Sequence, residues 1–223
     1  MSRALLAILA TSLFTMMPAC STARATAVGA LPNPVIDAPL ATTKGEQTAV
    51  IAGGCFWGVQ AVFEHVKGVI SVSAGYSGGA ADTAHYEMVS TGNTGHAESV
   101  RIKYDPSQIS YGQLLKVYFA VAHDPTELNR QGPDTGTQYR SAIFYGNAEQ
   151  KSIADGYIAQ LNKAGVFKRR IVTQVVALKA FYEAEAYHQG YAEQHPDEPY
   201  IAINDLPKVA ELRKQLPELY VQH

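Results

Sequence analysis

The sequence is short of cysteine: its 223 residues contain only Cys20 and Cys55. Cys20 falls in an apolar amino-terminal stretch that has the pattern of an export signal, so the domain that follows holds a single cysteine. One cysteine cannot form a disulfide within its own domain, which excludes a small fold cross-linked by disulfides. Any thiol chemistry in this domain depends on Cys55.

The sequence also has no excess of basic over acidic residues. Eighteen lysines and arginines stand against 20 aspartates and glutamates, and the formal net charge is -2. A surface that follows nucleic-acid phosphates needs an excess of positive charge, so we expect no nucleic-acid partner. The basic cluster at residues 168–170 is short and is typical of a solvated turn. With 47% hydrophobic residues, the chain has enough apolar material for a core.

The sequence also lacks the residue spacings that are typical of metal ligands. No histidine is followed by another four residues later, and no second thiol accompanies Cys55 in its domain. We therefore expect no metal and no bound cofactor, and we expect His96, His123 and His188 to form hydrogen bonds within the core. Arg140 is expected to pair with a carboxylate.

The amino terminus differs in character from the rest. A positive charge precedes an apolar stretch at residues 4–19, and residues 23–25 (Ala-Arg-Ala) fit a cleavage site. This pattern predicts an export signal at residues 1–25 and a location in the bacterial periplasm. A membrane helix is the alternative, although the stretch is short and ends at a proline. A second alternative is a lipid anchor on Cys20, which a loose lipoprotein-box match at residues 17–20 allows.

Residues 26–45 are rich in proline, alanine and threonine without periodicity, and they predict a flexible leader. A single domain, expected to be monomeric, follows at residues 46–223. Hydrophobic patterns predict strands at residues 48–52, 69–74, 100–104, 142–145 and 171–178, and helices at 55–67, 110–119, 148–163 and 181–194. This order predicts an α+β fold: a two-layer sandwich with helices packed on a mixed central sheet.

Cys55 follows Gly53 and Gly54 and precedes Phe56 and Trp57. A strand that ends before the glycines and a helix that begins near Cys55 place the thiol at the positive end of the helix dipole. We therefore expect the pKa of Cys55 to lie below that of a free cysteine. A buried structural cysteine is the alternative, but the flanking glycines and aromatics at a helix start favour a reactive thiol.

The segment at residues 54–58, Gly-Cys-Phe-Trp-Gly, resembles the active-site signature of the A-type peptide methionine sulfoxide reductases. Further segments resemble family motifs in the same order, at residues 75–79, 94–98, 123–141 and 187–191. The similarity extends from Gln47 to Leu206, which is most of the predicted domain.

The resemblance implies that Cys55 attacks the sulfoxide sulfur and that Glu98 protonates the sulfoxide oxygen. It also implies two hydroxyl donors (Tyr86 and Tyr139), an acid that orders the network (Asp134) and an apolar slot for the substrate methyl group (Phe56 and Trp57). A glutamate that acts as an acid near neutrality needs a raised pKa, which burial beside aromatic rings supplies.

The implied activity is reduction of the S epimer of methionine sulfoxide, free or in oxidised proteins. Many family members carry further cysteines near the carboxyl terminus, but residues 211–223 here contain none. A Cys55 sulfenic acid would then be reduced by an external thiol: a thioredoxin-like protein, or glutaredoxin with glutathione. Two other classes remain open: another thiol enzyme, such as a peroxidase or hydrolase, and a non-catalytic methionine-binding module.

Overall fold

The computed structural model describes residues 31–222, so the predicted export signal and Cys20 lie outside the described residues. A six-stranded sheet in the order β7-β6-β1-β3-β2-β8 forms the centre of the molecule. The strands are β1 (Gln47–Ala52), β2 (Val69–Ser77), β3 (Ala97–Tyr104), β6 (Ala142–Tyr145), β7 (Gln174–Ala177) and β8 (Phe181–Glu183). Neighbouring strands are antiparallel except β6 and β7, which are parallel, and the sheet is therefore mixed.

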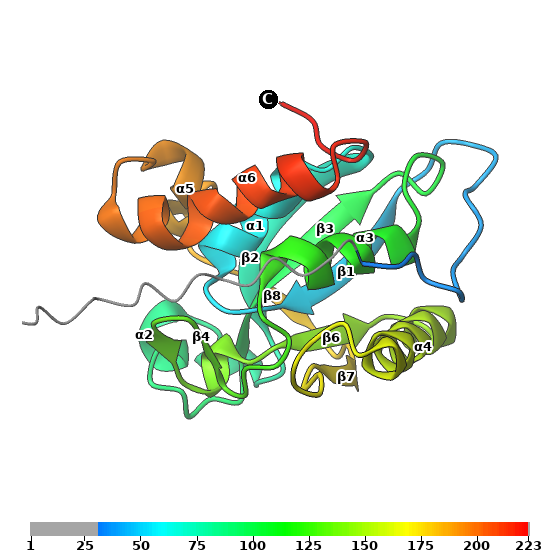
Figure 1. The fold of residues 1–223 in the computed structure, drawn as a ribbon. Coiled ribbons are helices and arrows are strands. Elements are labelled where there is room, and N and C mark those ends of the chain that lie inside the picture. Colours follow the sequence, from blue (N-terminus) through cyan, green and yellow to red (C-terminus); the bar gives the residue numbers. More distant parts are fainter. Residues whose placement is uncertain (1–30, 223) are drawn as a thin grey trace, which may run out of the picture.

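Helices pack on this sheet, and the predicted α+β class is confirmed. They are α1 (Phe56–Glu64), α2 (Tyr86–Val89), α3 (Tyr111–Val117), α4 (Ala148–Ala164), α5 (Tyr191–Gln194) and α6 (Leu206–Gln215). Shorter turns of helix are η1 (Ala81–Thr83), η2 (Tyr118–Ala122), η3 (Thr137–Tyr139), η4 (Ala186–His188) and η5 (Ile201–Asp205). Figure 1 shows α6 beside α1 and α4 against β6 and β7. A small hairpin, β4 (Arg130–Gln131) and β5 (Asp134–Thr135), stands apart from the sheet.

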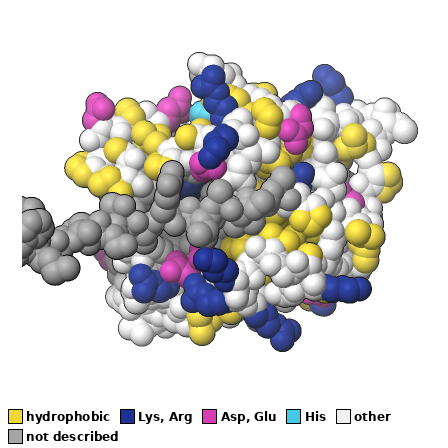
Figure 2. Space-filling view, in the orientation of Figure 1, with side chains coloured by type: hydrophobic (Ala, Val, Ile, Leu, Met, Phe, Trp, Pro, Cys, Tyr) yellow, Lys and Arg dark blue, Asp and Glu magenta, His cyan; other side chains and the backbone are white. Residues whose placement is uncertain are grey.

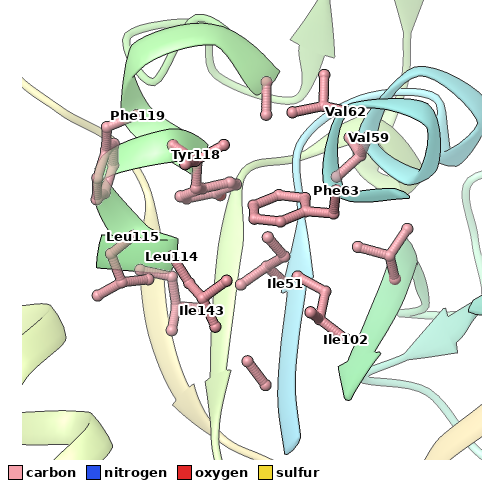
Figure 3. Packing of buried hydrophobic residues seen from close by; sticks show 14 of the residues in the cluster. Ile51, Val59, Val62, Phe63, Ile102, Leu114, Leu115, Tyr118, Phe119 and Ile143 are labelled. Carbon is pink, nitrogen blue, oxygen red and sulfur yellow. The ribbon is translucent and has the colours of Figure 1, made fainter. Parts of the chain in front are cut away.

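The main core lies between the sheet and the helices. Side chains from α1, from the central strands and from α3 with η2 point toward one another in Figure 3: Val59, Val62, Phe63, Ile51, Ile102, Ile143, Leu114, Leu115, Tyr118 and Phe119. Ala49 and Ile51 of β1 face this core, whereas Val50 and Ala52 face a second cluster on the other side of the sheet. Burial on both faces explains why β1 is a continuous apolar run.

The second cluster shows how strongly the sheet curls. Leu178 follows β7 and Phe181 begins β8, which are the two edges of the sheet, yet both pack against this one cluster. The Ser77 hydroxyl donates to the Ala180 carbonyl oxygen at 3.1 Å and holds the connection between the edges across this face. The end of β2 and the beginning of β3 are paired, and Glu98 near the beginning of β3 bonds to the first amide of α1.

The predicted helix at residues 181–194 is wrong. Residues 181–183 form β8, in which Tyr182 lies opposite Tyr76 of β2, and two short helical segments follow. The exposed edge of β2 offers unpaired backbone groups, and pairing with them outweighs the weak helical pattern. The helix–strand choice here depends on a partner about 100 residues earlier in the chain.

Residues 31–45 contain no helix or strand, but they pack against the domain. Leu31 is buried, and the Asp37 Oδ1 atom accepts a hydrogen bond from the Gly112 amide at 2.8 Å in the first turn of α3. The Tyr157 hydroxyl donates to the Pro32 carbonyl oxygen at 2.8 Å. This packing differs from the free leader expected from composition, because the Asp37 carboxylate satisfies amide donors that the helix itself leaves unpaired.

The surface carries mixed charge. In Figure 2, basic and acidic side chains lie among one another without a continuous basic stripe. The ion pairs Lys151–Asp155 (2.5 Å) and Lys214–Glu211 (2.9 Å) lie within single helices. Within residues 31–222, no helix has the length and apolar character needed to cross a membrane.

Candidate active site

Cys55 lies in the turn between β1 and α1, as the sequence predicts, and it is the residue that precedes the first turn of α1. Gly54 has a φ of 90°, and a Cβ atom there would lie 2.6 Å from the Cβ of Gln131. Glycine is therefore required at position 54 for both conformation and space. The Cys55 side chain is buried and forms no disulfide.

Glu98 lies on β3, and only 3% of its surface is exposed. Its Oε2 atom accepts a hydrogen bond from the Phe56 amide at 3.1 Å, and the Cys55 thiol lies near the same carboxyl group. Burial, with a smaller contribution from the nearby Asp134 carboxylate, raises the pKa of Glu98 to about 8, while the Phe56 amide opposes the change. The raised pKa expected of an acid is confirmed.

The expected low pKa of Cys55 is wrong. Burial raises the pKa of the Cys55 thiol well above its usual value, and the Glu98 and Asp205 carboxylates raise it further. The Trp57 amide at the start of α1 lowers the pKa, but by less. The physical reason is first that the thiol is buried, which disfavours its charged form, and second that a carboxyl group at the helix end faces it as well as free amides. In the unliganded site Cys55 is a thiol.

The structure brings Tyr86 and Tyr139 to the same place. Tyr86 begins α2 and Tyr139 ends η3, and both are partly buried. Burial is the largest cause of a raised pKa for both phenols, followed by the Glu98 carboxylate, and Cys55 also contributes to both. Both side chains therefore keep their protons and remain hydrogen-bond donors beside the thiol and the carboxyl group.

Asp134 is held by a tyrosine from the far end of the chain. The Tyr200 hydroxyl donates to Asp134 Oδ2 at 2.5 Å. Both residues line a cavity of about 70 Å³ that reaches Cys55. The full lining is Cys55, Gln131, Gly132, Pro133, Asp134, Tyr200, Asn204 and Lys208. The hairpin of β4 and β5 thus forms one wall of the site, and the segment η5–α6 forms the other.

Phe56 and Trp57 form an aromatic wall with a histidine. Phe56 is buried, and its ring centroid lies 4.9 Å from that of His188. The Trp57 indole stacks on Tyr191 with ring centroids 3.9 Å apart and donates from Nε1 to His188 Nδ1 at 3.2 Å. Tyr86 also contacts His188, with centroids 4.6 Å apart. This wall is apolar and rigid, as a slot for a methyl group requires.

Sequence reasoning missed several residues of the site. Tyr200, Asp205 and Lys208 belong to η5 and α6 or lie next to them, and the π-helical turn of η5 breaks the 3.6-residue spacing that would have marked a helix face. Glu185 was also missed; it accepts hydrogen bonds from the Tyr76 hydroxyl at 2.8 Å and the Tyr86 amide at 2.9 Å. No local pattern singles out these residues.

The remaining expectations concern histidines and Arg140. His123 bonds to the Tyr118 carbonyl oxygen at 3.1 Å and to Ser141 Oγ at 2.8 Å, as expected for a core histidine. Arg140 does not pair with a carboxylate; it donates to the carbonyl oxygens of residues 95, 96 and 137, where it ties the loop before β3 to η3. Residues 31–222 contain no group of three or more side chains arranged to hold a metal ion.

A buried thiol at a helix start, beside a protonatable carboxyl group and near two phenols, defines an enzyme of thiol-dependent oxidoreduction. A family model described as peptide methionine sulfoxide reductase matches residues 47–219. The chain belongs to this family.

Curated relatives and solved structures agree with this assignment. The chain is 61% identical over 176 residues to peptide methionine sulfoxide reductase MsrA 2 of Mesorhizobium japonicum, covering 79% of this chain and 90% of the relative. It is 53% identical to MsrA 2 of Synechocystis, covering 83% and 87%. The crystal structure of reduced Mxr1 from Saccharomyces cerevisiae matches with a TM-score of 0.60 at 31% identity, over 70% of this chain and 92% of that one. Methionine sulfoxide reductase A of Corynebacterium diphtheriae gives 0.59 at 38%, over 75% and 85%.

The raised pKa of Glu98 makes folding stability depend on pH. Because this pKa is about 8 in the folded protein against 4.5 ordinarily, the folded state binds more protons between these values, and stability falls as the pH rises through this range. Glu98→Gln removes this loss. We expect the difference in melting temperature between Glu98→Gln and wild type to increase by at least about 3 °C, in favour of the variant, from pH 5 to pH 8.

The measurement is thermal unfolding of both proteins across this pH range, with Glu193→Gln as the matched control for an exposed glutamate. The control should keep a constant offset from wild type. A constant offset for Glu98→Gln as well would contradict the raised pKa.

Proposed function

We propose that the protein reduces methionine sulfoxide, free or in oxidised proteins, to methionine by thiol chemistry at Cys55, and so repairs oxidised proteins. One observation carries the proposal: the Glu98 carboxyl group, with a pKa of about 8, is hydrogen-bonded to the amide that follows Cys55. Oxygen leaves a sulfoxide only after protonation, and a carboxyl group that keeps its proton at neutral pH supplies it beside the nucleophile.

In the proposed reaction the Cys55 sulfur attacks the sulfoxide sulfur while Glu98 gives its proton to the sulfoxide oxygen. The thiol proton passes to the Glu98 carboxylate. The oxygen, protonated a second time by Glu98, leaves as water, and the methionine sulfur stays bonded to the Cys55 sulfur as a sulfonium. Water then attacks the Cys55 sulfur and returns a proton to Glu98, the sulfur–sulfur bond breaks, methionine leaves, and Cys55 carries a sulfenic acid. The sulfoxide is reduced by two electrons and Cys55 is oxidised by two, so the step balances.

The surrounding residues take supporting roles in this proposal. Tyr86 and Tyr139 donate hydrogen bonds to the sulfoxide oxygen, because their raised pKa values keep both hydroxyls protonated. Asp134 orders this side of the site through its bond to the Tyr200 hydroxyl. Phe56 and Trp57 pack around the substrate methyl group, supported by His188.

The reductive half of the cycle requires an external thiol. No cysteine follows Cys55 in the sequence. A first thiol condenses with the sulfenic acid to a mixed disulfide and water, and a second thiol releases Cys55 and leaves as a disulfide. A thioredoxin-like protein, or glutathione with glutaredoxin, fits this chemistry, and no bound cofactor is needed.

We also propose that residues 1–25 direct export to the bacterial periplasm, with lipidation of Cys20 as the alternative, and that residues 46–223 act as one monomeric domain. The charged start, the apolar stretch and the Ala-Arg-Ala site support export. Mass spectrometry of the protein from its host should find an amino terminus near Thr26. An intact Met1 would contradict export, and a lipid on Cys20 would establish the alternative.

Replacing the two central groups tests the reaction. Cys55→Ser is expected to abolish reduction of methionine sulfoxide with a dithiol reductant, because residues 31–222 contain no other cysteine. Glu98→Gln keeps the shape but not the acidic proton, so we expect the single-turnover rate to fall roughly 10²–10⁴-fold. Circular dichroism checks that both variants fold. Residual activity in Cys55→Ser would refute the mechanism, and a wild-type rate in Glu98→Gln would remove Glu98 from its role.

Stereochemistry is a second prediction. The phenol donors and the aromatic wall fix the oxygen and the methyl group on different sides of the sulfur, so a single epimer fits, and the family resemblance indicates the S epimer. Resolved S and R epimers of methionine sulfoxide, assayed separately, should differ by orders of magnitude in kcat/KM. Equal rates would show that this wall does not determine specificity.

The missing second cysteine gives a third prediction. Without reductant, the protein should form one equivalent of methionine and gain one oxygen in mass on Cys55. The product should react with a sulfenate-trapping reagent and return to the thiol on addition of a small thiol. The Cys55→Ser variant serves as the control for both readouts. An intramolecular disulfide between Cys55 and Cys20 in the mature protein would contradict this expectation.

A further inference from the structure

A buried ion pair lies against the first turn of α1, and the proposed reaction assigns no role to either of its residues. Lys208 Nζ is 3.1 Å from Asp205 Oδ1, and Asp205 is fully buried. A Cβ atom on Gly58 would lie 2.7 Å from Lys208 Nζ and still closer to Asp205 Oδ1. Both charges are therefore packed on the backbone of α1 three residues after Cys55.

Lys208 also reaches the reacting thiol through the cavity. The cavity of about 70 Å³ is lined by Cys55 and Lys208 together, and Tyr200 and Asp134 also line it. The Lys208 side chain is largely enclosed, with 23% of its surface exposed. A charge in such a position acts on Cys55 with little screening by solvent.

This ion pair is a poor way to stabilise the fold. Asp205 Oδ2 is buried without a hydrogen-bond partner in the described structure, and burial raises the pKa of Asp205. A buried pair with an unsatisfied atom is often no better for stability than apolar residues of the same volume. Its position beside Cys55 therefore indicates a role in the chemistry of the site.

We propose that Lys208 is a positioning residue for the reaction of Cys55: Asp205 holds its ammonium group under the first turn of α1, where it favours the negatively charged form of the Cys55 sulfur. The inference rests on the proposed function of Cys55 as nucleophile. Charged and titratable groups facing Cys55 come from five other places: Glu98 on β3, Tyr86 on α2, Asp134 on β5, Tyr139 on η3 and Tyr200 before η5. The Glu98 carboxylate among them opposes the anionic sulfur, whereas Lys208 favours it.

The two members of the pair have opposite electrostatic effects on Cys55. Variants of the two residues therefore distinguish an electrostatic role from a structural one. Lys208 lowers the pKa of Cys55, and Asp205 raises it. Lys208→Met should therefore disfavour the thiolate. Asp205→Asn keeps an oxygen that can accept from Lys208 but removes the negative charge, so it should favour the thiolate. Damage to packing would instead change both variants in the same direction.

The experiment is the pH dependence of alkylation of Cys55 by iodoacetamide, measured on the full chain by mass spectrometry of the tryptic peptide 45–67, which excludes Cys20. We expect Lys208→Met to slow alkylation about tenfold at neutral pH, corresponding to a shift of about one pKa unit. Asp205→Asn should accelerate it. Lys208→Arg should stay within about threefold of wild type, because the positive charge is kept.

Lys214→Met is the matched control, since it removes an exposed lysine of α6 that pairs with Glu211. It should leave the profile unchanged. Equal effects of Lys208→Met and Lys214→Met, or changes of the same sign in Lys208→Met and Asp205→Asn, would overturn the proposal. The readout needs no methionine sulfoxide, so a failure here is distinguishable from a failure of the proposed reductase activity.

Discussion

The hydrogen bond from the Phe56 amide to Glu98 joins the first turn of α1 to the central part of the sheet, and the geometry of the site depends on it. Glu98 projects from β3, which lies between β1 and β2, and Cys55 is the residue before the bonded amide. A buried carboxylate is costly unless it is paired or protonated. The helix amide offsets only part of this cost, and the carboxyl group therefore keeps its proton near neutral pH.

Burial is the largest cause of the raised pKa of Cys55, and the same bond adds to it. At most helix starts the free backbone amides would donate hydrogen bonds to a thiolate, and a cysteine there would ionise more easily. Here Glu98 takes the Phe56 amide, and its negative charge disfavours the thiolate. A protonated Glu98 carries no charge and does not repel a Cys55 thiolate. The protonated form of Glu98, which acts as the acid, is therefore also the form that allows Cys55 to ionise. The two groups titrate as a coupled pair, and neither has a role independent of the other.

Local signals in the sequence predicted those parts of the fold that depend on neighbours along the chain. The turn between β1 and α1 holds Cys55 as the sequence indicated, and α3, which follows Ser110, and α4, which ends before Gly165, begin and end within one residue of the predicted positions 110 and 163. Glycine has a φ of 62° at position 165, and Ser110 forms a capping box, so the physics at both sites is local. The Cys55 pKa was predicted wrongly because it depends on Glu98, which approaches from a distant strand.

Long-range packing also explains the other differences. Phe181 and Tyr182 form a strand because β2 has a free edge, and residues 31–45 pack because Asp37 meets the start of α3. The sequence close to either segment does not show which distant residues it will contact. The roles implied for Glu98, Tyr86, Tyr139 and Asp134 came from a family resemblance, and the structure places these side chains around Cys55. The resemblance did not indicate Tyr200, Asp205 and Lys208.

These three residues show what the carboxyl-terminal segment contributes here. Many proteins of this family carry cysteines in this region, whereas this chain has a hydroxyl, a carboxylate and an ammonium group on η5, α6 and the residue before them. The segment therefore provides electrostatic control of Cys55 and no second thiol. A sulfenic acid on Cys55 would lie in a cavity of about 70 Å³, the volume of roughly two water molecules. A reductant thiol larger than this cavity must displace part of the wall formed by residues 131–134 or by η5 to reach the sulfur.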